Sequence, residues 1–418
     1  MKHGTSMARR GAVSAIAVVS AVALITGCAG GTGGSGGSED GSGGESGGVI
    51  KVGAILGETG GFPYGQVAPG VKAYFDKVNE DGGAGGYTFE LITADDKNDS
   101  GEAAQAARKL VQQDGVVGMV GTTSNVDCDA NKAFYEAQSI GTVGLGTGPT
   151  CFNSPNWMPV NPGPFVGQVA QMTYAFDTLG ATRVCAAFND DPTARDYVIA
   201  LADWFAETTG NEMTYVDVNI DPSASPVPAV TKAKNEGCEA LLLSTPGPSV
   251  VAFMQAAQSI GFEGTILAAA SAMDPSVPET LGGLAEAGAR GEADAGLIVV
   301  SEVASVTSTS PDVVEAIEAL DAAGVSPSFW NFVGWLSAAV FVNAIESDGG
   351  EHDPMTSEGV LEILRGMPAF ESGFTGSPLR FGEPNLGVQM MHVVGGVFEP
   401  APGQDASGWT VVPPLPTL

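Results

Sequence analysis

Small polar residues follow two neighbouring apolar runs in the chain, residues 116–120 and residues 142–145. After the first run stand Thr122, Thr123, Ser124 and Asn125, and after the second stand Gly146, Thr147 and Gly148. Hydroxyl groups, a side-chain amide and bare backbone N–H groups can hold a small polar molecule by hydrogen bonds. None of these residues pairs a nucleophile with a base, so the chemistry that they predict is binding.

The elements around these residues must bring them together. A helix-length segment, residues 128–138, separates the two apolar runs, so we expect a strand, a helical crossover and a parallel second strand. In an open parallel sheet, ligands bind beyond the carboxyl ends of the strands, which is where both polar loops fall. The alternative is that these residues only form turns, because Gly, Ser, Thr and Asn are common turn residues.

No other motif gives a stronger case for catalysis. The sequence Gly-Leu-Gly-Thr-Gly at residues 144–148 is the best candidate for an oxidoreductase, but its third glycine falls one residue early and Pro149 follows it. His352 and His392 have no nucleophile beside them in the sequence. We therefore expect no enzymatic activity and no cofactor, with an oxidoreductase as the weaker alternative.

Composition narrows the class of protein further. The chain has 418 residues and is 44% hydrophobic, which is enough for two or three domains with buried cores. There are 17 Lys and Arg residues against 48 Asp and Glu residues, giving a net charge of −31. Such a surface repels phosphate backbones, so we expect no nucleic-acid partner. The acidity can equally serve solubility alone.

The N-terminus has the pattern of an exported lipoprotein. Arg9 and Arg10 precede an apolar run, residues 12–25, which ends just before Cys28. This is typical of a secretory signal, and the run is short for a membrane span. The end of the run resembles a bacterial lipobox, in which the cysteine becomes the lipid-modified first residue of the mature protein. An ordinary signal peptide that happens to contain a cysteine is the alternative.

These features set the expected location of the protein. We predict a signal peptide over residues 1–27 and a Gly/Ser-rich flexible tether over residues 28–48. The mature protein would then be extracytoplasmic and anchored to the bacterial cell membrane through lipid on Cys28.

Four cysteines remain after the signal: Cys128, Cys151, Cys185 and Cys238. An even number in an oxidising compartment is typical of disulfides, and three pairings are possible. Cys-x-x-Cys does not occur and histidines are few, so we expect no metal site.

Strand and helix patterns alternate along most of the chain. The run of residues 49–120 reads as strand, helix, strand, helix, strand, and a second series of the same kind starts near residue 183. Two such series predict an α/β protein with two doubly wound parallel-sheet lobes.

Four segments in order resemble a known family. They are GAILGETGGFPYG, ELITADDKNDSGEAAQAARKLVQQDGV, GMVGTTSN and FMQAAQSIGFEGT. Together they are similar to the extracytoplasmic solute-binding lipoproteins of ABC transporters, of the branched-chain amino-acid (Leu/Ile/Val-binding) type. The resemblance implies a monomer that binds a small molecule and delivers it to an ABC permease in the membrane. A ligand-sensing subunit for a membrane receptor is the alternative.

The resemblance also implies a type I periplasmic-binding-protein fold, in which two lobes are joined by a three-crossing hinge. The expected crossings lie near residues 162–165, 301–304 and 382–385. The N-lobe would comprise residues 49–164 plus 303–382, and the C-lobe residues 165–302 plus 383–418.

The ligand-binding residues implied by the resemblance come from both lobes. They are Tyr64, Ser124, Asn125, Gly146, Thr147 and Gly148 in the first lobe and Thr193, Pro246, Ala270 and Ser271 in the second. Amino-acid binders of the family carry a carboxylate near positions 270–271 that pairs with the ligand ammonium, whereas the nearest acid here is Asp274. We therefore expect a neutral, hydroxyl-lined site and an amide, a urea-like solute or an acid as ligand. Arg195 could clamp a carboxylate, or it could be a solvated residue at a helix start.

The strand order implied by the resemblance bears on the cysteines. Cys185 and Cys238 would begin neighbouring parallel strands of the second lobe, where a bridge between them is within reach. The second bridge would then join Cys128 to Cys151 and hold the two ligand loops together.

Overall fold

The computed structural model describes residues 47–59, 64–189, 192–221, 224–288, 296–404 and 408–415, without the side chains of residues 189 and 192–194. The predicted signal peptide, Cys28 and most of the tether therefore lie outside the described residues. Within the described ranges, no helix is long and apolar enough to cross a membrane.

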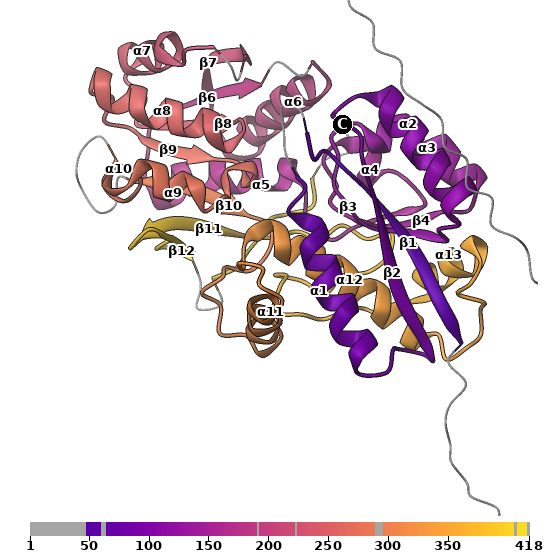
Figure 1. Cartoon of the computed structure of the whole chain (residues 1–418). Helices are drawn as coiled ribbons and strands as arrows, with labels where there is room; N and C mark the ends of the chain where they lie inside the picture. The colour runs from indigo at the N-terminus through magenta and orange to yellow at the C-terminus, as the bar shows by residue number, and fades with distance from the viewer. Residues whose placement is uncertain are drawn as a thin grey trace, which may run out of the picture. The chain divides into compact units, whose positions relative to one another are not determined.

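A parallel sheet is built from the N-terminal strands (Figure 1). Its strands are β1 (Gly48–Leu56), β2 (Tyr87–Asp95), β3 (Gly118–Thr122), β4 (Gly141–Gly144) and β5 (Trp157–Pro159). They lie in the order β2-β1-β3-β4-β5, and every neighbouring pair is parallel. The polar residues after β3 and after β4 thus emerge at the same edge of the sheet, as the helical crossover predicted.

Helices cover both faces of this sheet. The helices of this part of the chain are α1 (Val67–Glu80), α2 (Ser100–Lys109) with its continuation η1 (Leu110–Asp114), α3 (Asp127–Ala137), α4 (Pro149–Phe152), α11 (Pro311–Ala322), which packs on α1, α12 (Phe329–Ser347) and α13 (Ser357–Gly366). Alternation along β1 explains the two layers. Ile55 belongs to a core cluster with Leu110 and Tyr135 from η1 and α3. Val52 and Ala54 belong to the larger cluster that contains α1 and α12.

The helices α1 and α12 cross in unusually close contact. A Cβ atom on Gly70 would lie 2.0 Å from the carbonyl oxygen of Asn331, and one on Gly334 would lie 2.0 Å from the carbonyl oxygen of Val67. Only glycine permits this approach of the two backbones. The contact fixes the N-terminal turn of α12 beside the start of α1.

The second sheet is mixed and larger. Its strands are β6 (Val184–Asn189), β7 (Met213–Ile220), β8 (Ala240–Ser244), β9 (Thr265–Ala268), β10 (Leu297–Ser301), β11 (Gly387–Val394), β12 (Val397–Pro400) and β13 (Thr410–Val411). The order is β12-β11-β10-β9-β8-β6-β7, with β13 paired to β11. The strands β6 to β10 are parallel, whereas β11 runs antiparallel to β10. Two parallel-dominated sheets with helices around them confirm the predicted fold class.

The helices of the second sheet are α5 (Pro164–Thr173) with its continuation η2 (Tyr174–Thr178), α6 (Pro192–Thr209), α7 (Val227–Glu236), α8 (Gly247–Ile260), η3 (Ala270–Ala272), α9 (Ser276–Leu281) and α10 (Gly283–Ala287). The helix α5 packs against α6, β10 and β11. The helices α7, α8 and α9 pack in series, and in Figure 1 they lie near one another along the second sheet.

Both disulfides join the pairs that the resemblance implied. Cys128 is bonded to Cys151, linking α3 to α4 in the first sheet's loops, and Cys185 is bonded to Cys238, linking β6 to the segment before β8.

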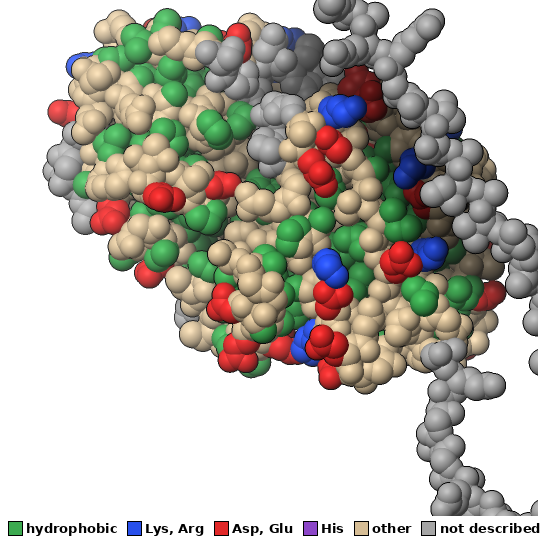
Figure 2. All heavy atoms as spheres, viewed as in Figure 1, with side chains coloured by type: hydrophobic (Ala, Val, Ile, Leu, Met, Phe, Trp, Pro, Cys, Tyr) green, Lys and Arg blue, Asp and Glu red, His purple; other side chains and the backbone are tan. Residues whose placement is uncertain are grey.

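Charged side chains of both signs lie side by side over α1 and α11 in Figure 2. Ion pairs there join Lys72 to Asp76 and Lys77 to both Asp81 and Glu315. Basic side chains are scarce in this chain, which has 17 Lys and Arg residues against 48 Asp and Glu residues.

Candidate functional site

A cavity of about 450 Å³ lies at the carboxyl ends of strands from both sheets. Leu145 follows β4, Asn125 follows β3, and Glu302 follows β10, and each lines the cavity. The ends of β6, β7, β8 and β9 contribute Phe188, Ile220, Ser244 and Ala269. Such edges of parallel sheets are where α/β proteins bind ligands, because loops of different strands converge there.

The structure brings most of the residues implied by the resemblance to this cavity. Those that line it are Tyr64, Asn125, Gly146, Thr147, Gly148, Ala270 and Ser271, together with Arg195. Ser124 and Pro246 are not among the lining residues. The side chain of Thr193 lies outside the described residues.

Ser124 does not line the cavity, and its hydroxyl bonds within the protein. Its side chain is 2% exposed, and its hydroxyl donates to the carboxylate of Asp96. The same oxygen accepts the backbone N–H groups of Val126 and Asp127 at 3.1 and 3.0 Å. It therefore accepts hydrogen bonds from N–H groups at the start of α3 and stabilises the loop after β3.

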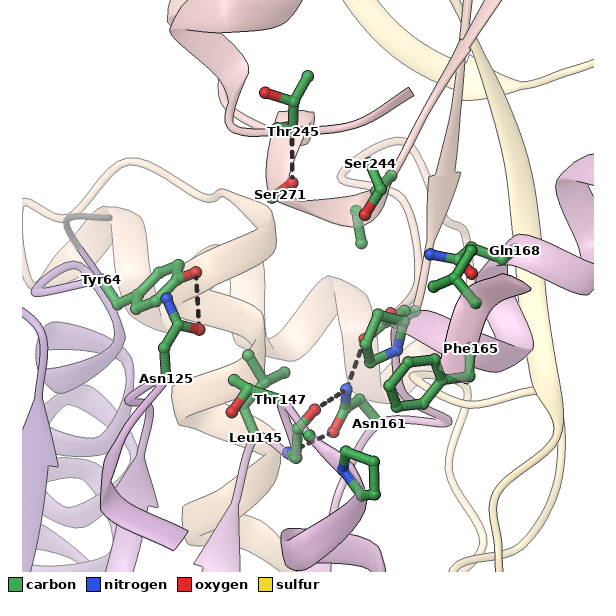
Figure 3. A pocket seen from close by; sticks show the side chains of 18 of the residues that line it. Tyr64, Asn125, Leu145, Thr147, Asn161, Phe165, Gln168, Ser244, Thr245 and Ser271 are labelled. Atoms are coloured by element: carbon green, nitrogen blue, oxygen red, sulfur yellow. Dashed lines mark hydrogen bonds between the residues drawn. The ribbon is translucent and has the colours of Figure 1, made fainter. Parts of the chain in front are cut away.

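Pro246 lies one residue beyond the cavity wall. It is the N-cap residue of α8, and its neighbour Thr245 lines the cavity instead. The hydroxyl of Ser271 donates to the carbonyl oxygen of Thr245 over 3.1 Å, which links the loop after β8 to η3 (Figure 3).

Aromatic side chains form part of the wall. The hydroxyl of Tyr64 donates to Oδ1 of Asn125 over 3.4 Å, and the rings of Tyr64 and Trp330 have centroids 5.0 Å apart. Phe165 faces the cavity from the start of α5 (Figure 3), with its ring 4.1 Å from that of Tyr197. The cavity can thus hold an apolar or aromatic group as well as a polar one.

Asn161 organises the deepest polar part of the site. Its Oδ1 accepts the backbone N–H of Gly146 at 2.8 Å, and its Nδ2 donates to the carbonyl oxygen of Gly146 at 3.0 Å. The same Nδ2 donates to Oε2 of Glu302 at 2.5 Å. Dashed lines in Figure 3 mark the bonds of Asn161. One amide therefore holds the loop after β4 against the end of β10.

Glu302 changes the expected character of the site. It is 4% exposed, and burial raises its pKa to about 7, although the hydrogen bond from Asn161 acts in the opposite direction. We expected a neutral, hydroxyl-lined site because no acid stands near positions 270–271. The structure adds a buried carboxyl group from the end of β10, which lies outside the loop after β9 on which that expectation rested.

Sequence reasoning missed Glu302, although a signal was present. An acidic residue directly follows the apolar run that forms β10, at the carboxyl end of the strand. Asn161, Phe165 and Trp330 carried no comparable signal, because each reaches the cavity from a connection or a helix start.

Arg195 lines the cavity but is already paired. Its Nε donates to Asp196 at 3.1 Å and its Nη1 donates to Asn219 at 2.8 Å. Its side chain is 25% exposed, so it lies nearer to solvent than Glu302 does.

Two α/β sheets with a cavity at their strand ends define a protein of the ligand-binding class with the type I periplasmic-binding-protein fold. The chain belongs to the periplasmic binding protein family, whose pattern matches residues 49–396. Among curated proteins, none matches the chain.

Solved structures share this fold. A leucine-binding protein from Thermotoga maritima is 22% identical, with a TM-score of 0.68 over 84% of this chain and 99% of the other. A branched-chain amino-acid ABC transporter protein from Thermus thermophilus with bound valine is 18% identical, with a TM-score of 0.73 over 86% of this chain and 97% of the other. A solute-binding protein of an ABC transporter from Rhodopseudomonas palustris BisB5, in complex with 3,4-dihydroxybenzoic acid, is 17% identical. Its TM-score is 0.67 over 84% of this chain and 96% of the other. At these identities the likeness establishes the fold.

Proposed function

We propose that this protein binds a small solute in the cavity and delivers it to the permease of an ABC importer, without catalysing a reaction. The observation that carries the proposal is the convergence of strand ends from both sheets on one cavity, in a member of the periplasmic binding protein family. The solute class that we propose is an amino acid or a related amide or carboxylate. Solved structures of the same fold hold valine and a dihydroxybenzoic acid.

We further propose that the two sheets belong to lobes that close on the ligand. The N-lobe would be residues 49–164 plus 303–382 and the C-lobe residues 165–302 plus 383–418. Hydrogen bonds near the proposed crossings support this division, since Asn161 bonds Glu302 and Nδ2 of Asn385 donates to the carbonyl oxygen of Val160 at 3.4 Å. A ligand that contacts both lobes stabilises the closed form by its higher affinity for that form.

Family membership implies an extracytoplasmic location. The finer proposal is that residues 1–27 are a signal peptide and that lipid on Cys28 keeps a monomeric protein near the membrane. The tether of residues 28–48 would let the folded part reach a permease.

A thermal-shift screen of residues 29–418 tests the binding function. Free ligand at about 1,000 times its Kd adds roughly 4 kcal/mol to the free energy of unfolding, so a true ligand raises the melting temperature clearly. The panel contains amino acids, small amides and small carboxylic acids. If none of them raises the melting temperature, the proposed solute class is wrong.

Uptake of the identified solute by cells with and without the gene separates delivery from sensing. Delivery requires that uptake falls when the gene is deleted. Unchanged uptake, with a changed cellular response to the solute, would establish the sensing alternative.

A further inference from the structure

Glu302 is a buried carboxylate whose oxygens can accept further hydrogen bonds. Asn161 donates to Oε2, and no other group of the described chain donates a hydrogen bond to the carboxylate. A carboxylate can accept about four hydrogen bonds. Because Glu302 lines the cavity, a molecule in the cavity can supply the missing donors.

No cation of the described chain neutralises Glu302. Its neighbours are Asn161, Gly167 of α5, and Tyr64, whose phenol is close enough to feel the charge of Glu302. Tyr64 is the only titratable group among them, and the charge of Glu302 helps to raise the pKa of that phenol further.

The other charged residues on the cavity wall do not provide a counter-charge. They are Asp129, which is also acidic, and Arg195, which is engaged with Asp196 and Asn219. The net charge of −31 adds a general preference for cations over anions. A buried carboxylate without a cation is costly, and a positively charged ligand group would relieve that cost.

We propose that Glu302 is the specificity-determining residue of the cavity and binds a protonated amine of the ligand, displacing a proton when it does so. This inference rests on the proposed solute-binding function and narrows it to solutes that carry an amine cation. The apolar part of such a solute would contact Tyr64, Phe165 and Trp330, whose ring faces also favour a nearby cation.

Proton displacement gives this site a defined pH dependence. The pKa of Glu302 in the empty cavity is about 7, so the side chain is mostly protonated below that pH. A bound ammonium stabilises the ionised form and lowers the pKa of Glu302 in the complex. The affinity for an amine therefore approaches its maximum above about pH 8 and falls by up to tenfold for each pH unit well below 7.

The test measures binding of matched pairs of probes by calorimetry, with the thermal shift as a second readout. The amine probes are L-leucine, L-phenylalanine and phenethylamine, and the amine-free probes are 4-methylpentanoate and 3-phenylpropanoate. Proteins compared at pH 5 to 8 are the wild type, Glu302→Gln and the matched control Asp274→Asn. Asp274 accepts the N–H of Ser276 and does not line the cavity.

At pH 8 we expect at least one amine probe to bind the wild type and Asp274→Asn, and its affinity for Glu302→Gln to fall by tenfold or more. The pH dependence below 7 should disappear in Glu302→Gln. The inference is overturned if amine-free probes bind and amines do not, or if Glu302→Gln keeps the same pH profile. If Glu302→Gln folds poorly, the pH dependence of amine affinity in the wild type tests the inference by itself. If neither these probes nor the wider panel of solutes binds, the proposed solute-binding function itself fails.

Discussion

Nδ2 of Asn161 lies 2.5 Å from Oε2 of Glu302, although 141 residues separate the two in the chain. The same amide group makes reciprocal hydrogen bonds with both backbone groups of Gly146. Asn161 is therefore the junction at which a loop of the first sheet and a strand end of the second sheet are held together.

Replacing Asn161 with alanine should destabilise the protein and weaken ligand binding. The backbone N–H of Gly146 and the carboxylate of Glu302 would both lose their hydrogen bonds, and an unsatisfied buried group costs roughly 1–3 kcal/mol. We expect the free energy of unfolding to fall by about 2–4 kcal/mol. Urea denaturation measures this change.

Asn153 provides the matched control for that variant. It is exposed at the C-terminal end of α4 and bonds no cavity residue through its side chain. Asn153→Ala should change the free energy of unfolding by less than about 0.5 kcal/mol. Equal effects of the two substitutions would contradict the role given to Asn161.

Removing the Cys128–Cys151 bridge should affect both stability and binding. The bridge spans 23 residues of sequence, and closing a loop of about this size is worth roughly 3 kcal/mol in the chain-entropy model. It also joins the start of α3, which follows the polar loop after β3, to α4, which follows the polar loop after β4. Thermal and urea unfolding of the double Ala variant, with ligand affinity measured beside it, checks the prediction.

Removing the Cys185–Cys238 bridge separates the effect on stability from the effect on ligand binding. It spans 53 residues, so its loss should lower stability by a similar or larger amount. None of its atoms lines the cavity, and we expect ligand affinity to stay within about threefold of the wild type. If removing the Cys185–Cys238 bridge weakens binding more than removing the Cys128–Cys151 bridge does, the Cys128–Cys151 bridge does not act by holding the cavity loops in place.

The buried carboxyl group of Asp127 should make stability depend on pH. Burial is the main cause that raises its pKa to about 7, and the nearby charge of Asp96 adds to this. Hydrogen bonds from Asn131 at 2.7 Å and from the hydroxyl of Tyr135 at 3.0 Å act in the opposite direction.

The direction of this pH dependence follows from proton binding by Asp127 in the folded and unfolded states. The folded state holds the Asp127 proton up to about pH 7, whereas the unfolded state releases it near its ordinary value of 3.8. The stability that this proton provides is present below pH 4 and is lost as the pH rises towards 7. Relative to Asp127→Asn, the wild type should therefore lose up to about 1.4 kcal/mol of unfolding free energy for each pH unit over this range. Parallel stability curves for the two proteins would contradict the raised pKa.

Trp330 should report ligand binding by its fluorescence. Its ring lines the cavity, 5.0 Å from that of Tyr64, so an occupant changes its surroundings. We expect the ligand-induced change of tryptophan emission to disappear in Trp330→Phe, with affinity reduced by less than about tenfold. Trp204 does not line the cavity, and Trp204→Phe should keep the signal. Persistence of the full signal in Trp330→Phe would mean that the ligand binds elsewhere.

The order of strands and helices was determined by the sequence alone. Alternating apolar strands and amphipathic helices predict a parallel sheet, and the polar residues after β3 and β4 must then share one edge. Family resemblance added the positions of Tyr64, Asn125, Thr147 and Ser271, all of which line the cavity.

Only the tertiary structure decided which polar groups face the cavity. Ser124 stands between cavity residues in the sequence, yet its hydroxyl is turned inward to Asp96 and the start of α3. Glu302 reads as a charged residue at a strand end, and its burial depends on packing against α5 and on Asn161, which are distant in the chain. Sequence fixes strand ends because periodicity is local, whereas the direction and the pKa of a side chain depend on contacts between distant segments.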